Sequence, residues 1–326
     1  MDNLNGYKAF EPGMICKGKQ YQENTDYEEE GGEICEKGMM HYCVNPFDVL
    51  NFYPLVNDSG KVSDFATVKS LEEPVSGDDG KFATKKLHIG VKLGLAGFVN
   101  ACIDYIKEKP IEKAPNSTVS SGNYAQIGSS GYSAQIGSSG NSAQIGSSGY
   151  SAKIGSSGNY AQIGSSGDSA QIGSSGYYAQ IGSSGYSAQI GSSGYYAQIG
   201  SSGDSAQIGS SGNYAQIGSS GDSAKIGSSG DSAKIGSSGY YAKIGSSGDS
   251  AQIESSGEYS VICCSGAASI VKAKLGSWIT LAEWKYLDEK NRMVPQFVKT
   301  EFVDGERIKA DTWYKLIGGK FTEVSP

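Results

Sequence analysis

One nine-residue phrase, repeated fifteen times without a gap from Gly122 to Ser256, constrains the fold of this chain more than any other feature. A fixed short period is typical of a solenoid, in which each unit buries its apolar face only against its neighbours. A flexible Gly/Ser-rich linker is the alternative that the composition allows. A linker needs neither a strict period nor an apolar pair in every unit, so the pattern favours the solenoid.

Positions in the phrase are counted from the residue after its leading Gly. Position 1 is Asn, Asp or Tyr, position 2 is Tyr or Ser, position 3 is Ala, position 4 is Gln or Lys, and position 5 is Ile. On a strand, positions 3 and 5 point to one face and positions 2 and 4 to the other. The Gly-Ser-Ser-Gly segment suits a bend. Each unit is therefore predicted to be a strand plus a corner, with Ala and Ile as the aliphatic core.

Tyrosine at position 2 indicates how many units make one coil. Tyr124, Tyr160, Tyr178, Tyr196 and Tyr214 are separated by multiples of eighteen, and the intervening units carry Ser at this position. Two units per coil explain this spacing, because successive units then lie on opposite sheets. The predicted fold is mainly β: a two-sided parallel β-solenoid of nine-residue units, about eighteen residues per coil.

Four segments differ in composition. Apolar residues at helical spacing from Leu95 to Ile106 and the helix start Asn45-Pro46 indicate an α+β region before the array. Aromatic, alternating segments after Ser277 indicate a β-meander that caps the solenoid. The predicted domains are residues 1–113, an α+β head; 114–121, a linker with a partial first unit; 122–274, the solenoid with its degenerate last units; and 275–326, the β cap.

Charge and hydropathy exclude several classes of protein. The formal net charge is −7, and no basic stripe typical of nucleic-acid binding is visible. No apolar run approaches the eighteen residues of a membrane span, and the first residues lack the basic and apolar regions of a secretory signal. Six cysteines in such a chain indicate reduced thiols. We therefore expect a cytoplasmic protein that binds no nucleic acid and no membrane.

Metal-binding patterns are weak. Cys16, Cys35, His41 and Cys43 could hold zinc, but their spacing lacks the close pair of a zinc site, which favours buried structural thiols. His88 is expected to be an ordinary strand histidine. Cys263 and Cys264 are expected to place one thiol in the core and one outside. The acidic residues of the array do not occupy the position that a calcium-binding nonapeptide requires; they are Asp168, Asp204, Asp222, Asp231 and Asp249. We expect no metal and no cofactor.

The N-terminal stretch Gly38-Met39-Met40-His41-Tyr42-Cys43-Val44-Asn45-Pro46-Phe47-Asp48-Val49, with Tyr53-Pro54, resembles uncharacterised phage and prophage proteins. In these proteins such a domain is often followed by nonapeptide arrays. The segments Val298–Glu301 and Trp313–Leu316 are similar to tails on the same proteins. The resemblance implies a genomic context and no particular activity.

A second hypothesis concerns the head. Tyr7-Lys8-Ala9, Gly38 to His41, and Tyr53 resemble the early strands of ADP-ribosyltransferases, and Glu72 and Glu73 are available carboxylates. This resemblance implies an ADP-ribosyltransferase-like or nucleotide-binding head, with the solenoid as a spacer.

The leading hypothesis is a non-enzymatic phage or prophage accessory protein whose rigid solenoid presents a repetitive Tyr/Ser/Gln surface to a macromolecular partner, such as a host or defence protein. Contacts between copies through the solenoid faces or ends are compatible with it. An exposed aromatic column offers contact area at low entropic cost. The predicted binding residues are Tyr160, Tyr178, Tyr196 and Tyr214 on one sheet, and Tyr241 and Tyr259 on the opposite sheet.

Overall fold

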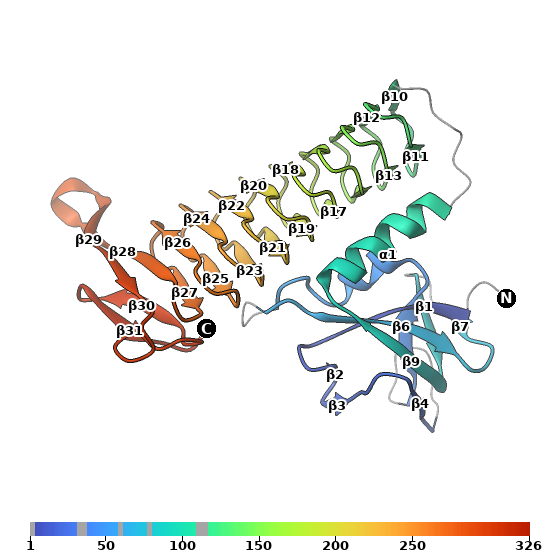
Figure 1. Cartoon of the computed structure of the whole chain (residues 1–326), viewed down its shortest axis with the longest axis horizontal. Helices are drawn as coiled ribbons and strands as arrows, with labels where there is room; N and C mark the ends of the chain where they lie inside the picture. The colour runs from blue at the N-terminus through green and yellow to red at the C-terminus, as the bar shows by residue number, and fades with distance from the viewer. Residues whose placement is uncertain (1–3, 31–37, 58–60, 77–79, 109–116) are drawn as a thin grey trace.

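The computed structural model describes the chain except residues 1–3, 31–37, 58–60, 77–79 and 109–116. An α+β head is followed by a two-sided β-solenoid and an antiparallel β cap, which is the architecture that the sequence predicts (Figure 1). Within the described residues, no helix has the length and apolar character that crossing a bilayer requires.

Two parallel sheets form the solenoid, and successive units alternate between them. Each strand pairs with the strand two units later, so that Ile163 lies opposite Ile181 and Ile172 opposite Ile190. The register of eighteen residues per coil is therefore the one predicted. We call one sheet the covered sheet and the other the open sheet.

The covered sheet contains β11 (Gln126–Ser129), β13 (Gln144–Ser147), β15 (Gln162–Ser165), β17 (Gln180–Ser183), β19 (Gln198–Ser201), β21 (Gln216–Ser219), β23 (Lys234–Ser237), β25 (Gln252–Ser255) and β27 (Ile270–Ala273). The open sheet contains β10 (Ser117–Ser120), β12 (Gln135–Ser138), β14 (Lys153–Ser156), β16 (Gln171–Ser174), β18 (Gln189–Ser192), β20 (Gln207–Ser210), β22 (Lys225–Ser228), β24 (Lys243–Ser246) and β26 (Val261–Cys264).

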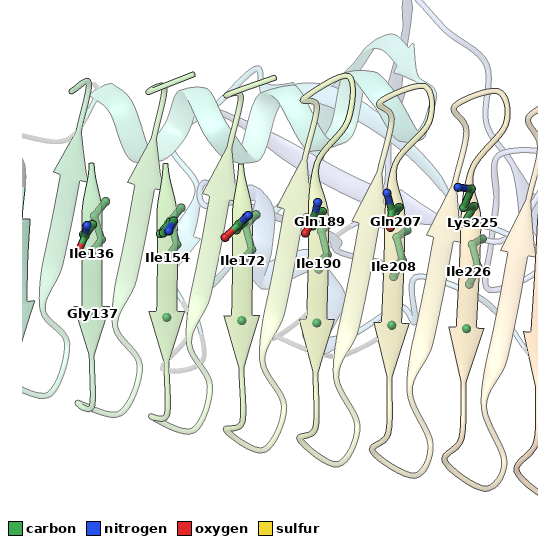
Figure 2. Close-up of a pocket in the computed structure, with 18 of the residues that line it drawn as sticks. Ile136, Gly137, Ile154, Ile172, Gln189, Ile190, Gln207, Ile208, Lys225 and Ile226 are labelled. Carbon is green, nitrogen blue, oxygen red and sulfur yellow. The ribbon is translucent and has the colours of Figure 1, made fainter. Parts of the chain in front are cut away.

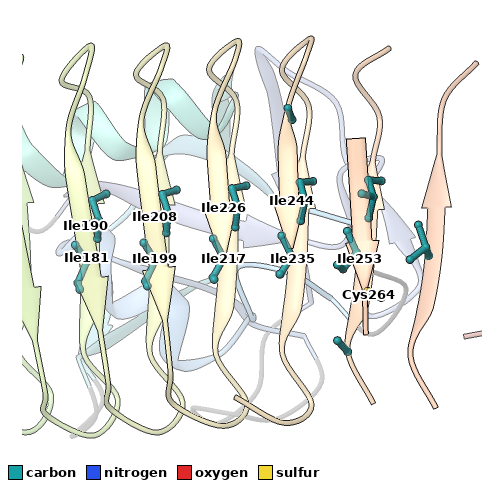
Figure 3. Close-up of a cluster of buried hydrophobic side chains, with 14 of the residues drawn as sticks. Ile181, Ile190, Ile199, Ile208, Ile217, Ile226, Ile235, Ile244, Ile253 and Cys264 are labelled. Atoms are coloured by element: carbon teal, nitrogen blue, oxygen red, sulfur yellow. The ribbon is translucent and has the colours of Figure 1, made fainter. Parts of the chain in front are cut away.

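The interior of the solenoid is built from isoleucine, alanine and serine. Ile181, Ile199 and Ile217 of one sheet face Ile190 and Ile208 of the other, and all are buried (Figure 3). The Ala at position 3 and the first Ser after the Ile-Gly pair are buried beside them; in one unit these are Ala179 and Ser183. The core is thus less purely aliphatic than expected, because the strand extends two residues past the Ile and its alternation turns a serine inward.

The corner begins later in the phrase than the sequence predicts. Each strand covers positions 4 to 7, so Gly-Ser belongs to the strand, and the bend falls on the second Ser, the leading Gly and positions 1 and 2. Position 2 adopts a left-handed backbone in many units, with φ of 56° at Tyr178 and 58° at Ser205. The leading Gly has no room for a side chain, since a Cβ on Gly203 would lie 1.8 Å from the Gly185 carbonyl oxygen. This close approach explains why glycine recurs there.

The head consists of one antiparallel sheet, whose strands differ in length, together with a 3-10 helix and an α-helix. The order of its strands is β4-β9-β6-β1-β5-β8-β7. The bounds are β1 (Asn5–Phe10), β4 (Thr25–Glu28), β5 (Met40–Cys43), β6 (Asp64–Ser70), β7 (Val75–Ser76), β8 (Lys81–Thr84), β9 (Lys86–Leu93), η2 (Pro46–Asn51) and α1 (Leu95–Glu108), with a separate β2 (Ile15–Cys16) and β3 (Lys19–Gln20) hairpin.

Local sequence signals account for the two helices. Asn45 caps η2 as its sequence predicts, with Oδ1 accepting a hydrogen bond from Phe47 N at 3.1 Å. The element is a 3-10 helix of six residues rather than an α-helix. Helix α1 matches its predicted apolar spacing, and its Phe98 ring stacks on Phe65 of the head sheet with ring centroids 3.8 Å apart.

The head packs back onto the solenoid, with α1 lying along β13, β15, β17 and β19 (Figure 1). Its apolar side chains lie over the outward glycines of the covered sheet: a Cβ on Gly200 would lie 3.2 Å from Val99 Cγ2 and 3.5 Å from Leu95 Cδ1. Glutamines beside these glycines bond to the head, with Gln198 Nε2 donating to the Leu50 carbonyl at 3.4 Å. Helix α1 is therefore held between the head sheet and the solenoid.

The cap continues both sheets of the solenoid. β28 (Trp278–Leu287) extends the open sheet and pairs with β29 (Arg292–Phe302), while β30 (Tyr314–Ile317) and β31 (Lys320–Glu323) extend the covered sheet. A short 3-10 turn, η3 (Asp288–Lys290), joins β28 to β29. The hairpins of the predicted meander are present. By extending the sheets, they supply backbone partners to the last coil, which an array of identical units cannot provide.

Candidate functional site

The predicted column of position-2 tyrosines is present as a stack of exposed rings. The ring centroids of Tyr160 and Tyr178 are 5.2 Å apart, and those of Tyr178 and Tyr196 and of Tyr196 and Tyr214 are 5.0 Å apart. The planes of neighbouring rings differ by 9° or less. Such offset, nearly parallel rings attract each other beyond their burial.

The stack lies along a corner of the solenoid rather than on a sheet face, which corrects the sequence prediction. Position 2 is left-handed, so the chain is still turning when it reaches the tyrosine. The amide of Tyr160 donates to the Tyr177 carbonyl at 2.8 Å, and that of Tyr178 donates to Tyr195 at 2.9 Å. These bonds hold each ring above the next at the corner that leads into the covered sheet.

Sequence reasoning missed two further tyrosines on the same corner. Tyr177 and Tyr195 stack at position 1, with ring centroids 5.4 Å apart. Their separation of eighteen residues in the sequence is the signal that identifies them, as it does for the tyrosines at position 2. We call the combined set the six-tyrosine edge: Tyr160, Tyr177, Tyr178, Tyr195, Tyr196 and Tyr214, whose exposed fractions are 40–57%.

The opposite corner carries shorter stacks. Tyr241 and Tyr259 stack with centroids 5.7 Å apart, at the corner that leads into the open sheet rather than the covered one. Tyr132 and Tyr150 form another pair at the same corner, 5.3 Å apart. The two groups of predicted binding tyrosines therefore lie on different sides of the solenoid, as expected, but at its corners.

The acidic and amide residues at position 1 have a structural function. Oδ1 of Asn159 accepts a hydrogen bond from the Tyr177 amide at 2.9 Å, and Oδ1 of Asp231 accepts one from Asp249 at 2.9 Å. Asp204, Asp222 and Asp249 make the same bond to the residue eighteen positions later. This ladder satisfies a corner amide that the strands leave unpaired.

The outward face of the open sheet is a shallow groove with a polar wall. Figure 2 shows Gln189, Gln207 and Lys225 in one row along the groove. A parallel row of glycines forms its floor, and a Cβ on Gly191 or Gly209 would meet no heavy atom within 4 Å. The outward positions of β12 to β26 include three lysines and no carboxylate. This face is therefore positively charged on a chain whose net charge is −7.

The cysteine and histidine predictions have different outcomes. Cys35 lies outside the described residues, so the structure does not test the four-residue zinc site. Cys16 Sγ lies 3.0 Å from Tyr53 Oη, and Cys43 is buried. His88 Nδ1 lies 2.6 Å from Asp26 Oδ1 at the surface. The prediction for the adjacent pair is confirmed, since Cys264 is buried and Cys263 is exposed.

We expect the fold to be independent of metal ions. The described residues contain no group of three or more metal-ligating side chains, and the position-1 aspartates are engaged by backbone amides. Addition of EDTA should leave the melting temperature unchanged, and elemental analysis should find no stoichiometric zinc or calcium. A chelator-dependent fall in the melting temperature would contradict this prediction.

Residues 4–101, which make up most of the head, match the model of a family described as Domain of unknown function (DUF7666). No curated protein and no solved structure matches the chain. The family match thus delimits a unit that contains the head sheet and the first half of α1, without assigning an activity to it.

Proposed function

We propose that the chain is a non-enzymatic, cytoplasmic accessory protein of a phage or prophage that binds a protein partner through its solenoid. The observation that carries this proposal is the difference between the two sheets. They have the same sequence repeat, yet the head occupies one of them, and the described chain leaves the other open. The open sheet is thus a second copy of a surface that already binds a folded element.

The covered sheet shows how such a surface holds a protein. Leu95 and Val99 of α1 rest on the glycine row, and the adjacent glutamines hydrogen-bond to the head. Gln162 Nε2, for example, donates to Asp48 Oδ1 at 3.4 Å. The open sheet offers the same glycine row and a Gln/Lys row, so a helix with aliphatic residues such as leucine and valine, flanked by acidic residues, matches it.

The six-tyrosine edge adds an aromatic border between the two sheets. Tyrosine is enriched in the energetically important parts of protein interfaces because it combines apolar area with a hydroxyl and loses little entropy on binding. The number of exposed rings on that corner exceeds what its stability needs, because other coils carry serine at position 2 of the same corner with a similar left-handed backbone, as at Ser142 and Ser232. This excess supports a binding role.

Replacing Tyr178, Tyr196 and Tyr214 together with serine should weaken partner binding strongly and preserve the fold. Serine already occupies position 2 of the same corner at φ of 56° in Ser232, so the backbone tolerates it. Each lost ring should weaken binding by about 1 kcal/mol or more, or roughly 100-fold in total. The melting temperature should fall by only about 3 °C. Binding is measured by quantitative pull-down from host lysate, and stability by circular dichroism.

A matched control replaces Tyr132 and Tyr150 with asparagine, a residue that the array uses at position 1. This variant removes a stacked pair from the opposite corner, and it should bind the partner as well as the wild type does. If the triple variant melts far below the wild type and loses binding only as it unfolds, the tyrosines are structural. Equal loss of binding in both variants points to nonspecific adhesion and contradicts the proposal.

The alternative of an ADP-ribosyltransferase-like head receives less support. Glu72 Oε1 accepts a hydrogen bond from the Lys85 amide at 2.7 Å, and Glu72 and Glu73 are not among the described residues that line the head cavity. Incubating the full-length protein with labelled NAD tests it directly, since label transfer or NAD cleavage would support the enzyme and contradict the non-enzymatic proposal.

A further inference from the structure

The head contains a cavity of about 630 Å³ that is separate from the solenoid surfaces. It lies between β1, β5, the β2–β3 hairpin and η2, and this volume is in the range of small-molecule sites. The residues that matter for its chemistry are Lys8, Lys17, Lys19, Phe52, Tyr53 and Lys81.

Lys8 is a buried lysine on the wall of this cavity. Its exposed fraction is 7%, and its Nζ donates a hydrogen bond to the His41 carbonyl oxygen at 2.8 Å. Within the described part of the chain, no carboxylate forms an ion pair with it. Burial lowers the pKa of Lys8, while the nearby Cys16 thiol acts in the opposite direction. A buried ammonium group is costly unless an anion accompanies it.

Most of the other charged side chains among the described residues that line the cavity are positive. Lys17, Lys19 and Lys81 also line it, and Lys17 is exposed. The carboxylate among the described lining residues is that of Glu29, which is ion-paired with Lys19. Several ammonium groups around one concave site attract an anion and favour one with more than a single negative charge.

Aromatic side chains form part of the wall. The Lys81 ammonium lies 4.3 Å from the centroid of the Phe52 ring, and Tyr53 Oη lies 3.0 Å from Cys16 Sγ. Burial raises the pKa of Tyr53, so its hydroxyl stays neutral and can donate a hydrogen bond. Aromatic walls beside ammonium groups suit a ligand with a flat ring.

We propose that this cavity binds a small organic phosphate with a planar aromatic body. Its phosphate lies against the ammonium groups of Lys8 and Lys17, and its ring lies against Phe52 and Tyr53. A phosphate monoester carries between one and two negative charges at neutral pH, which matches several lysines better than a carboxylate does. This site is independent of the solenoid surface and of its partner.

The test is calorimetric titration of the full-length protein with adenosine monophosphate and flavin mononucleotide. Inorganic phosphate and benzoate serve as probes for the charge and the ring alone. At least one of the two aromatic phosphates should bind at least tenfold more tightly than inorganic phosphate and benzoate. Lys8→Met, which removes the charge and keeps the chain length, should weaken this binding by at least tenfold.

Lys8→Met could also lose binding by unfolding, so two further variants test the site without changing a buried residue. Lys17→Glu reverses an exposed charge at the cavity and should also weaken binding by at least tenfold. Lys69→Met removes an exposed lysine of β6 that does not line the cavity and should leave binding unchanged. The proposal is overturned if neither aromatic phosphate binds, if benzoate binds as tightly, or if Lys17→Glu retains wild-type affinity.

Discussion

Replacing Ile181 with aspartate is expected to destabilise the protein by on the order of 5 kcal/mol or more, because it removes a large core side chain and buries a charge. Ile181 has an exposed fraction of 3% and lies in register with Ile163 and Ile199, so a carboxylate there is surrounded by isoleucines. Since total stabilities are about 5–15 kcal/mol, much of the solenoid should unfold. Circular dichroism and chemical denaturation measure this loss.

The matched control is Gln189→Ala on the open sheet. Gln180 is the sequence neighbour of Ile181 and would be the first choice of control, since alternation along a strand points it away from the core. The structure does not support that choice, because Gln180 has an exposed fraction of 6% and its Nε2 donates to Asn51 Oδ1 at 3.3 Å. Gln189 is exposed, so its replacement should change stability by less than about 0.5 kcal/mol. If Ile181→Asp and the wild type had similar melting temperatures, this result would contradict the burial of Ile181 in the solenoid core.

Replacing Gly200 with valine is expected to displace the head from the covered sheet. Val99 and Leu95 already lie within 3.2–3.5 Å of where a Cβ would be, so a branched side chain overfills the interface. Overpacking of this kind destabilises a packed interface by about 1–3 kcal/mol. The protein avoids this strain if α1 dissociates from the covered sheet. Hydrogen exchange should show faster exchange in α1 while the solenoid strands remain protected.

The same substitution on the open sheet provides the control. Gly191 occupies the equivalent position in β18, and its surroundings are empty within 4 Å. Gly191→Val should therefore leave both α1 and the melting temperature unchanged, and valine suits a strand. If the two variants behave alike, the contact between α1 and the glycine row does not hold the head in place.

Much of the solenoid could be predicted from sequence, because the residue pattern that specifies each coil lies within eighteen residues and is repeated along the array. The spacing of Tyr178 and Tyr196 predicts the coil of eighteen residues, and the Ala-x-Ile pattern predicts which side chains are buried. Each unit meets only copies of itself, so a rule that holds for one coil holds for the next. The corner was harder, because Tyr and Ser at position 2 give no signal of a left-handed backbone.

Tertiary structure alone decided which copies of the repeat are accessible. Gln180 and Gln189 have identical neighbours in the sequence, yet one is buried under the head and the other is exposed. The cavity that contains Lys8 likewise depends on β1, β5, the hairpin and η2 meeting in space. The sequence by itself determined the period, the aliphatic part of the core and the eighteen-residue spacing of the position-2 tyrosines. Because the strands of both sheets share the Ile-Gly-Ser sequence, only the non-repeated head, by packing on one of them, makes their accessibility different.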